Sequence, residues 1–228
     1  MNPLTSVTII IPTLNEEKNI GMLLSLVTTQ YPGIKIIVAD DGSKDQTKVI
    51  VDKFKNILFI DRKNEKIKGL TASIIDGIFH TKTKFFIVMD GDLQHPPEKL
   101  KEFVVALNKG VNIVVGVRRK VLVFWPWYRR LMSHSATLAG MIRLAIYGVH
   151  CKDILSGFFA MKTKDAVRIL TKKQRAFQPK GYKILFDFLK NMRCIDVVSV
   201  YYDFGLRDGG KSKMGLKVVY YYFRSLFS

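Results

Sequence analysis

The chain has 228 residues, 48% of them hydrophobic and 25% charged, a composition typical of a folded globular protein and not of a disordered one. We expect no transmembrane helix, because no apolar run approaches the roughly 20 residues that a bilayer span needs, and no signal peptide at the N-terminus. We expect its 2 cysteines, Cys151 and Cys194, to stay free in a reducing compartment.

The formal net charge of +18 is distributed unevenly along the chain. Residues 1–100 hold 13 Lys/Arg and 12 Asp/Glu, whereas the remaining residues hold 24 Lys/Arg and 7 Asp/Glu. A solvated basic surface would explain this excess, and so would a polyanionic partner such as nucleic acid or an anionic membrane. Charge alone does not choose between them.

The first 117 residues alternate short β-branched runs with helix-like segments. In chain order we expect strand Val7–Ile11, helix Asn15–Gln30, strand Lys35–Ala39, helix Thr47–Phe54, strand Ile57–Ile60, helix Gly69–His80, strand Phe85–Met89, helix Pro96–Asn108 and strand Asn112–Val117. Repeated βα alternation predicts an α/β fold of the Rossmann-like kind, with a mostly parallel central sheet flanked by helices.

The second half is basic and aromatic, and we expect it to be built onto the same sheet. A strand is predicted at Ser156–Met161, a helix at Gly181–Asn191 and a long strand at Ile195–Tyr202. A loop rich in Gly and Lys follows at Arg207–Lys213. Because we find neither an internal repeat nor a low-complexity linker, we expect one domain over residues 1–228.

Ligands of parallel sheets bind beyond the carboxyl ends of the strands, where this chain carries polar loops. These loops are Pro12–Glu16, Asp40–Ser43 and Asp90–Pro97. No G-x-G-x-x-G or P-loop pattern follows the first strand, which argues against a dinucleotide oxidoreductase and against a P-loop nucleotidase.

Asp90 and Asp92 end an apolar strand, one residue apart across Gly91. Two carboxylates in this arrangement are suited to a hard divalent cation, and Gln94 offers a further oxygen. A D-x-D pattern by itself is also common in solvated turns. Asp40 and Asp41, at the end of another strand, are suited to accept hydrogen bonds from a nucleotide, and a nucleotide-diphosphate–metal site accounts for both pairs.

Several blocks of the sequence resemble the inverting family 2 glycosyltransferases and, more narrowly, the dolichyl-phosphate mannose synthases. The blocks are Ile9–Glu16, Val38–Ser43, Met89–Glu98, Gly116–Arg118, Trp125–Arg129, Asp153–Phe158, Gly181–Leu185 and Phe204–Lys213. The resemblance extends over about residues 6–215, and its last two blocks are the most specific to enzymes acting on polyprenyl phosphates. It implies the glycosyltransferase A-type fold, with residues 1–117 as the nucleotide-sugar half and 118–228 as the acceptor and membrane-facing half.

The resemblance also implies roles for individual residues. The donor nucleotide would be bound by Pro12, Asn15, Glu16, Asp40 and Asp41, with Asp41 reading the base. The metal, Mg²⁺ or Mn²⁺, and the donor diphosphate would be held by Asp90, Asp92 and Gln94. The acceptor phosphate would lie near Arg118, Arg129 and Ser133, and the donor phosphates near Arg207, Ser212 and Lys213. Of these, Asp92, Arg118 and Arg129 are the predicted catalytic residues.

Three departures from the family pattern concern the acceptor side and the metal loop. The family often has Gly-Ser-Arg-Tyr where this chain has Gly116–Arg119, and Ala where it has Gly91. The segment between Arg118 and Trp125 is also short.

A lipid phosphate suits this residue set, because it is largely dianionic at neutral pH and needs no general base. Together with this chemistry, the resemblance implies inverting transfer of mannose from GDP-mannose to dolichyl or another polyprenyl phosphate. A second reading keeps the chemistry with another donor, such as UDP-glucose. A third has a carbohydrate hydroxyl as acceptor and needs a catalytic carboxylate, for which Asp153 is the candidate. A fourth is a non-catalytic module that binds nucleic acid or membrane.

The chemistry favours a membrane surface over nucleic acid as the partner of the basic half. We expect Val121–Tyr147 and Leu216–Phe227 to form interfacial amphipathic segments that meet anionic lipid. The protein would then be peripheral, on the cytoplasmic face of a membrane, with a separate anchoring subunit as a further candidate partner. His95 follows the metal motif, and we expect its role to be structural.

Overall fold

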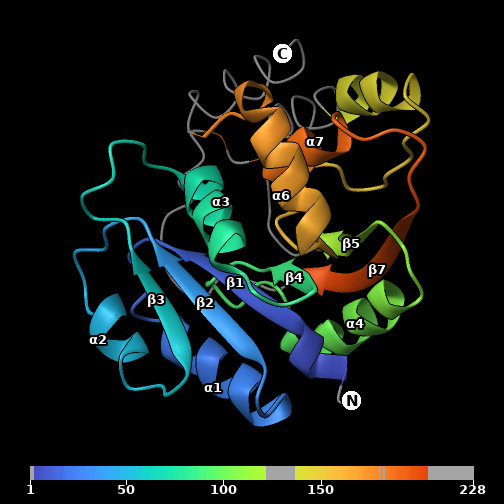
Figure 1. Ribbon diagram of the computed structural model, residues 1–228. Helices are drawn as coiled ribbons and strands as arrows, with labels where there is room; N and C mark the ends of the chain where they lie inside the picture. The colour runs from blue at the N-terminus through green and yellow to red at the C-terminus, as the bar shows by residue number, and fades with distance from the viewer. Residues whose placement is uncertain (1–2, 122–136, 180, 182, 205–228) are drawn as a thin grey trace.

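The computed structural model describes residues 3–121, 137–179, 181 and 183–204 as one seven-stranded sheet with helices on both faces (Figure 1). The strands are β1 Val7–Thr13, β2 Lys35–Asp40, β3 Ile57–Asp61, β4 Phe85–Val88, β5 Ile113–Val121, β6 Phe159–Lys162 and β7 Val197–Phe204. The helices are α1 Ile20–Gln30, α2 Thr47–Val51, α3 Leu70–His80, α4 Leu100–Asn108, α6 Thr163–Lys172 and α7 Ile184–Leu189. Single 3₁₀ turns lie at Pro3–Ser6, Pro97–Lys99 and Gln174–Ala176, and residues 137–145 are helical.

The strand order is β3-β2-β1-β4-β6-β5-β7, and the sheet is mostly parallel, as predicted. Only β6 runs antiparallel to its neighbours among the described strands, and it lies between β4 and β5. Phe159 of β6 pairs with Val88 on one side and with Val115 on the other. Because β6 and β7 come from the second half of the chain, both halves contribute to the same sheet.

The core forms two layers because successive residues of the central strands point to opposite faces. Ile9 and Ile11 of β1 pack on the face that α1 and α4 cover, whereas Ile10 packs on the face of α3, α6 and α7. All three isoleucines have no exposed surface. This two-sided burial explains why the predicted strands are continuous apolar runs and not alternating ones.

Two predictions about helices were wrong. The first helix was expected to begin at Asn15 but begins at Ile20, because Asn15 has a left-handed backbone (φ 53°) that no helix accommodates. The long predicted helix after β4 starts as a 3₁₀ turn, and α4 itself begins at Leu100. In addition, α6 was not predicted, although its buried residues recur at helical spacing (Ala166, Ile169 and Leu170).

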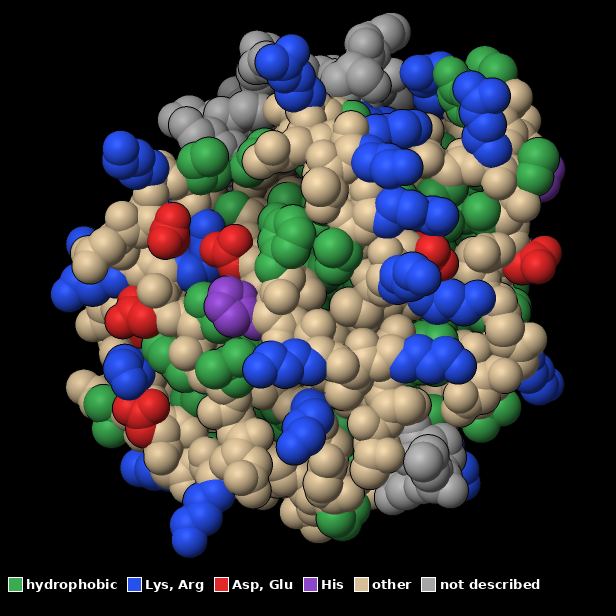
Figure 2. Space-filling model, in the orientation of Figure 1, with side chains coloured by type: hydrophobic (Ala, Val, Ile, Leu, Met, Phe, Trp, Pro, Cys, Tyr) green, Lys and Arg blue, Asp and Glu red, His purple; other side chains and the backbone are tan. Residues whose placement is uncertain are grey.

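Within the described part of the chain, no helix has the length and apolar character needed to cross a membrane. Both cysteines are free, as predicted, and burial raises the pKa of the Cys151 thiol to about 12. Lys and Arg side chains gather on the side of the molecule where α6 lies (Figure 2).

Candidate functional site

The carboxyl ends of β1 and β2 are joined by the buried carboxylate of Asp40. One of its oxygens accepts hydrogen bonds from the backbone N–H groups of Gly42 (3.0 Å) and Ser43 (2.7 Å). The other accepts from the hydroxyl groups of Thr13 (2.9 Å) and Ser43 (2.5 Å). These bonds shape the loop after β2, so Asp40 supports the pocket wall from within.

The loop after β1 is bonded side by side to the loop after β2. Asn15 donates its backbone N–H to the Ser43 hydroxyl (2.7 Å), and its side-chain oxygen accepts from the backbone of Lys44 (2.8 Å). The backbone N–H of Glu16 donates to the hydroxyl of Thr47 (2.9 Å). With the left-handed backbone of Asn15, its backbone N–H and its side-chain oxygen both bond to the loop after β2. This explains why α1 starts only at Ile20 and not at Asn15.

Asp41 is held by a buried arginine that sequence analysis missed. Its carboxylate contacts the Arg62 guanidinium and accepts the backbone N–H of Gly69 (2.7 Å). Arg62 also bonds Asp76 through Nε (2.6 Å) and the hydroxyl of Ser73 (3.1 Å). Burial raises the pKa of Asp41, and this effect is larger than the lowering by the hydrogen bond from Gly69 and by the charge of Arg62. The predicted base-reading carboxylate is therefore part of a buried ion network.

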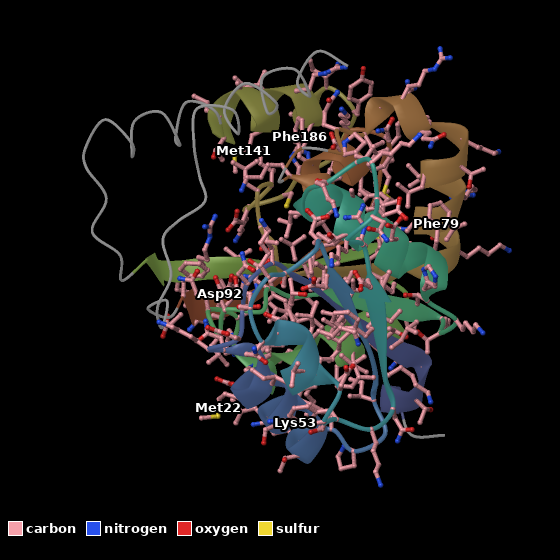
Figure 3. All side chains as sticks on the ribbon, turned by 90° about the vertical axis from the view of Figure 1, so that its left-hand side faces the viewer. Met22, Lys53, Phe79, Asp92, Met141 and Phe186 are labelled. Carbon is pink, nitrogen blue, oxygen red and sulfur yellow. The ribbon has the colours of Figure 1, made fainter. Side chains whose placement is uncertain are left out.

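Asp90 and Asp92 follow β4 on a loop closed by His95. The His95 ring accepts the backbone N–H of Asp90 at Nδ1 (3.0 Å) and brings Nε2 within 3.8 Å of the Asp90 carboxylate. Asp92 accepts the backbone N–H of Gln94 (3.2 Å), and the residue between them, Leu93, has a left-handed backbone (φ 62°). This tight turn keeps the predicted metal ligands within one short loop, with Asp92 at the level of the sheet (Figure 3).

His95 is fully buried, and its ring stacks on Phe158 with 4.9 Å between centroids. Burial lowers the pKa of His95 to about 4, although the charge of Asp92 raises it, so the ring is neutral at pH 7. These contacts place the His95 ring behind the loop that carries Asp90 and Asp92.

Two glycines at this loop differ in how closely their neighbours approach. A Cβ on Gly157 would lie 3.0 Å from the nearer oxygen of Asp90, closer than side chains normally come. At Gly91 a Cβ would meet its nearest neighbour, Thr13, at 3.4 Å, an ordinary contact. An alanine at position 91, as in the family pattern, would therefore fit without a change in the loop geometry.

Arg118 reaches the site from β5 and is paired with Asp153. Its Nε and Nη2 donate to the two oxygens of that carboxylate at 2.8 and 3.1 Å. Burial acts to lower the pKa of Arg118, but the contact with Asp153 raises it, so the side chain stays cationic. Ser156 anchors the segment after Asp153 by donating to the Gly116 carbonyl (2.8 Å).

The described geometry thus gathers most of the predicted donor and metal residues at one edge of the sheet. Pro12 is buried at the end of β1, and the Cγ of Glu16 lies 3.7 Å from where a Gly91 Cβ would stand. Five predicted residues lie outside the described residues: Arg129, Ser133, Arg207, Ser212 and Lys213. Two contributors were not assigned a role by sequence analysis: Arg62 and Gly157.

The oxygen donors of this loop fit a hard divalent cation. Asp90, Asp92 and Gln94 supply two carboxylates and one amide, the ligand types that Mg²⁺ and Mn²⁺ accept. Within the described ranges, no group of three or more His, Cys, Asp or Glu side chains is suited to hold a metal ion. Among the described residues, Asp90, Asp92 and Gln94 are the ligands on this loop, and a cation held by these three would take further oxygens, as from a bound diphosphate or water.

Residues 8–170 match the model of glycosyl transferase family 2. The chain belongs to this family. Among its relatives, a dolichol-phosphate mannosyltransferase from Pyrococcus furiosus is 34% identical over 97% of this chain and 62% of its own length. A dolichol-phosphate mannosyltransferase from Saccharomyces cerevisiae is 28% identical over 96% of this chain and 84% of its own. A polyprenol monophosphomannose synthase from Mycolicibacterium smegmatis is 28% identical over 94% of this chain and 83% of its own length.

Among solved structures, this family 2 chain resembles glucosyl-3-phosphoglycerate synthase from Mycobacterium tuberculosis in complex with Mn²⁺, UDP-glucose and phosphoglyceric acid. The TM-score is 0.66 at 14% identity, with 97% of this chain and 80% of that chain covered. At this identity the likeness concerns the fold, which is the glycosyltransferase A-type fold predicted from the sequence. Because the chain spans 62% of the Pyrococcus relative, that protein contains a further part with no counterpart in the match.

Proposed function

We propose that this protein transfers mannose from GDP-mannose to dolichyl or another polyprenyl phosphate, forming polyprenyl-phosphate mannose. The observation that carries the proposal is the 34% identity, over 97% of this chain, with a dolichol-phosphate mannosyltransferase. The described site supports it, because acidic loops meet cations from the second half of the chain at one edge of the sheet.

The proposed reaction forms one bond and breaks one. An oxygen of the lipid phosphate attacks the anomeric carbon of mannose as the bond from that carbon to the GDP diphosphate breaks, which inverts the configuration. No proton has to move, because a phosphomonoester, with a second pKa of about 6, is largely dianionic at neutral pH. The protein's task is to bring two anions together, which requires positive charge on both sides of the reacting carbon.

Asp90, Asp92 and Gln94 would hold Mg²⁺ or Mn²⁺, which, when bound, would neutralise the charge that develops on the leaving diphosphate. His95 would keep the loop in place from behind. Asn15, Glu16 and the turn braced by Asp40 would form the nucleotide pocket. Asp41, paired with the buried Arg62, would act on this pocket through the shape of its wall.

The pairing of Asp153 favours a phosphate acceptor over a carbohydrate hydroxyl. A hydroxyl acceptor needs a general base within hydrogen-bond reach, and Asp153 was the candidate. Both of its oxygens, however, accept hydrogen bonds from Arg118. Asp153 engages Nε and Nη2 of Arg118 and does not engage Nη1, which could donate to a phosphate, and guanidinium groups bind phosphate well.

The test is transfer of radiolabelled sugar to dolichyl phosphate in detergent with Mn²⁺, comparing GDP-mannose with UDP-glucose. Label that enters the lipid phase from GDP-mannose alone is the expected result. Transfer from UDP-glucose alone would keep the mechanism and replace the sugar. No transfer from either donor, in a folded sample with metal, would reject the proposal.

The helical residues 137–145 and the turn that follows support binding to a membrane surface. Leu138, Ile142 and Ile146 are four residues apart and 58–71% exposed, so they form an apolar ridge along one side of this segment. Two arginines, Arg143 and Arg193, lie over the ring of Tyr147 at 5.1 and 5.2 Å from its centroid. An exposed apolar ridge beside cations is typical of interfacial helices. We propose a peripheral position on the cytoplasmic face of a membrane, where anionic lipid would meet the basic half.

Replacing Ile142 with Glu should weaken binding to vesicles of phosphatidylcholine and phosphatidylserine roughly tenfold, because a charge replaces an apolar contact with lipid. Vesicle sedimentation measures this. The matched control is Met22→Glu, since Met22 is 60% exposed on α1 and lies on the opposite side of the sheet from Met141 (Figure 3). Equal loss in both variants would contradict a specific role for the ridge.

A further inference from the structure

A pocket of about 460 Å³, here called the α6 pocket, lies between α6 and residues 191–195, which lead from α7 to β7. Its volume falls within the range of small-ligand sites. Four exposed cationic residues and one acidic residue are among those that line it: Arg168, Lys172, Lys173, Arg193 and Asp165. The side of the molecule where α6 lies is also where Lys and Arg side chains gather (Figure 2).

The charges of the α6 pocket do not balance one another. Asp165 accepts a hydrogen bond from Arg168 (3.1 Å), so one cation is matched. Lys172, Lys173 and Arg193 form no ion pair within 4.0 Å among the residues that the structure describes. The negative end of the α6 dipole explains two lysines at the end of that helix, but not an arginine from another segment. Cations that converge without acids repel one another, and a bound anion would relieve this repulsion.

The α6 pocket borders the apolar ridge of Leu138, Ile142 and Ile146. The guanidinium of Arg193, which lines the pocket, lies 5.2 Å from the centroid of the Tyr147 ring, and Tyr147 directly follows the ridge. The backbone N–H of the next pocket residue, at position 194, donates to the Tyr147 carbonyl (3.3 Å). Apolar side chains of interfacial helices enter the boundary between headgroups and acyl chains. A ridge in that position would bring the pocket beside it to the level of the headgroups.

The α6 pocket is separate from the reaction centre. Asn112 lines the pocket and directly precedes β5, whereas Arg118 lies six residues further along that strand. At about 3.3 Å per residue, these two positions are roughly 20 Å apart. An anion in the α6 pocket is therefore neither the donor diphosphate nor the acceptor phosphate.

We infer that the α6 pocket binds the phosphomonoester headgroup of an anionic membrane lipid other than the acceptor. The inference rests on the membrane position given under the proposed function and adds a headgroup site to it. A phosphomonoester carries close to two negative charges at neutral pH, which suits three unmatched cations better than the single charge of a phosphodiester. Ammonium and guanidinium groups both bind phosphate. Single-stranded nucleic acid fits less well, because it is bound along extended grooves with aromatic platforms and not in one small pocket beside an apolar ridge.

The test is sedimentation with phosphatidylcholine vesicles that contain either phosphatidic acid or phosphatidylserine, matched in surface charge. The wild type should prefer phosphatidic acid, because its headgroup is a phosphomonoester. Replacing Lys172 and Lys173 together with Gln should weaken binding to the phosphatidic acid vesicles roughly tenfold. Binding to the phosphatidylserine vesicles should fall by less than about threefold, so that the preference is lost.

Replacing Lys53 and Lys55 together with Gln is the matched control. Both lysines are exposed just after α2, and Lys53 lies at the opposite end of the molecule from Phe186 of α7 (Figure 3). This variant loses the same charge, and the preference for phosphatidic acid should remain. Equal losses in the two double variants would overturn the inference, since net charge and not the pocket would then govern binding. Equal binding of the wild type to both kinds of vesicle would also overturn it.

Two further ligands distinguish the lipid from other sources of phosphate. Glycerol 3-phosphate, titrated by calorimetry without vesicles, should bind more weakly than about 1 mM, because no ridge contact supports it. Tighter binding that the Lys172 and Lys173 variant loses would assign the pocket to a soluble phosphate and overturn the lipid assignment. A 20-nucleotide RNA that binds the wild type more tightly than the vesicles do, and the variant less, would overturn it in favour of nucleic acid.

Transfer to dolichyl phosphate in detergent separates this inference from the proposed function. The Lys172 and Lys173 variant should match the wild type, because the α6 pocket is remote from the reaction centre, and this also shows that the variant is folded. A loss of transfer in this variant alone would overturn the inference. If the wild type itself transfers no mannose, the proposed reaction fails, while the preference for phosphatidic acid is still decided by the vesicles.

Discussion

The loops after β2 and β4 each present two acidic residues at the same edge of the sheet, yet their surroundings differ. Asp41 is 9% exposed and contacts a guanidinium that is itself 3% exposed. The Asp90 carboxylate is 34% exposed and lies beside a histidine ring that is neutral at pH 7. A carboxylate matched by a buried cation contributes to architecture, whereas one that faces solvent beside a neutral ring can still meet a cation from outside. Sequence position alone does not separate these two cases.

The largest effect should come from the loop after β4. Replacing Asp92 with Asn should lower the rate of metal-dependent transfer about a thousandfold, because it removes an anionic ligand while keeping the shape of the side chain. The amide oxygen can still accept the Gln94 N–H, so the urea unfolding midpoint should stay unchanged. Near-normal transfer by this variant would show that the β4 loop is architectural too.

The loop after β2 should respond in the opposite way. Replacing Arg62 with Met should reduce the free energy of unfolding by about 3–5 kcal/mol, because it leaves Asp41 buried without its cation. Urea unfolding at pH 7 measures this. Below its unfolding midpoint the variant should retain transfer within about tenfold, since no reacting group is removed. A loss of donor affinity without a loss of stability would instead make this ion network part of the nucleotide site.

Acid should destabilise the protein through His95. Its pKa is about 4 in the folded state and 6.5 as the ordinary value, so between these pH values the unfolded chain binds more protons than the folded one. Stability is therefore lost as the pH falls from about 6.5 toward 4, by about 2 kcal/mol at pH 5 from this group. Urea unfolding at pH 7 and pH 5 should show a smaller difference in His95→Asn. The exposed His80, replaced in the same way, should leave the difference unaltered.

The smallest effect concerns two glycines of the site. Gly157→Ala should weaken Mn²⁺ binding about tenfold, because the added Cβ would press on the Asp90 carboxylate at 3.0 Å. Gly91→Ala, on the metal loop itself, should leave Mn²⁺ binding as it is, since its Cβ finds an ordinary contact. Calorimetry with Mn²⁺ and GDP measures both, and equal behaviour of the two variants would contradict the steric argument.

Much of the nucleotide half could be predicted, because its strands are continuous apolar runs and its polar loops follow them directly. The acids of the site were found for the same reason. Arg62 was missed because it lies in a segment rich in Lys, which in sequence is typical of a solvated loop. The pairing of Arg118 with Asp153 joins residues 35 positions apart, and no local pattern indicates it. Asn15 was misread as the start of a helix, because its left-handed backbone depends on its bonds to the neighbouring loop.

The position of β6 has a consequence for biosynthesis. Because β6 lies between β4 and β5, the ribosome must complete residue 162 before β5 can join the sheet that β1 to β4 have begun. Until then the free edge of β4 and both edges of β5 remain open to wrong pairing, and such non-local assembly is slow. The nascent chain should thus depend most on chaperones between the synthesis of β5 and the arrival of β6, a stretch that includes the exposed apolar side chains of Leu138, Ile142 and Ile146.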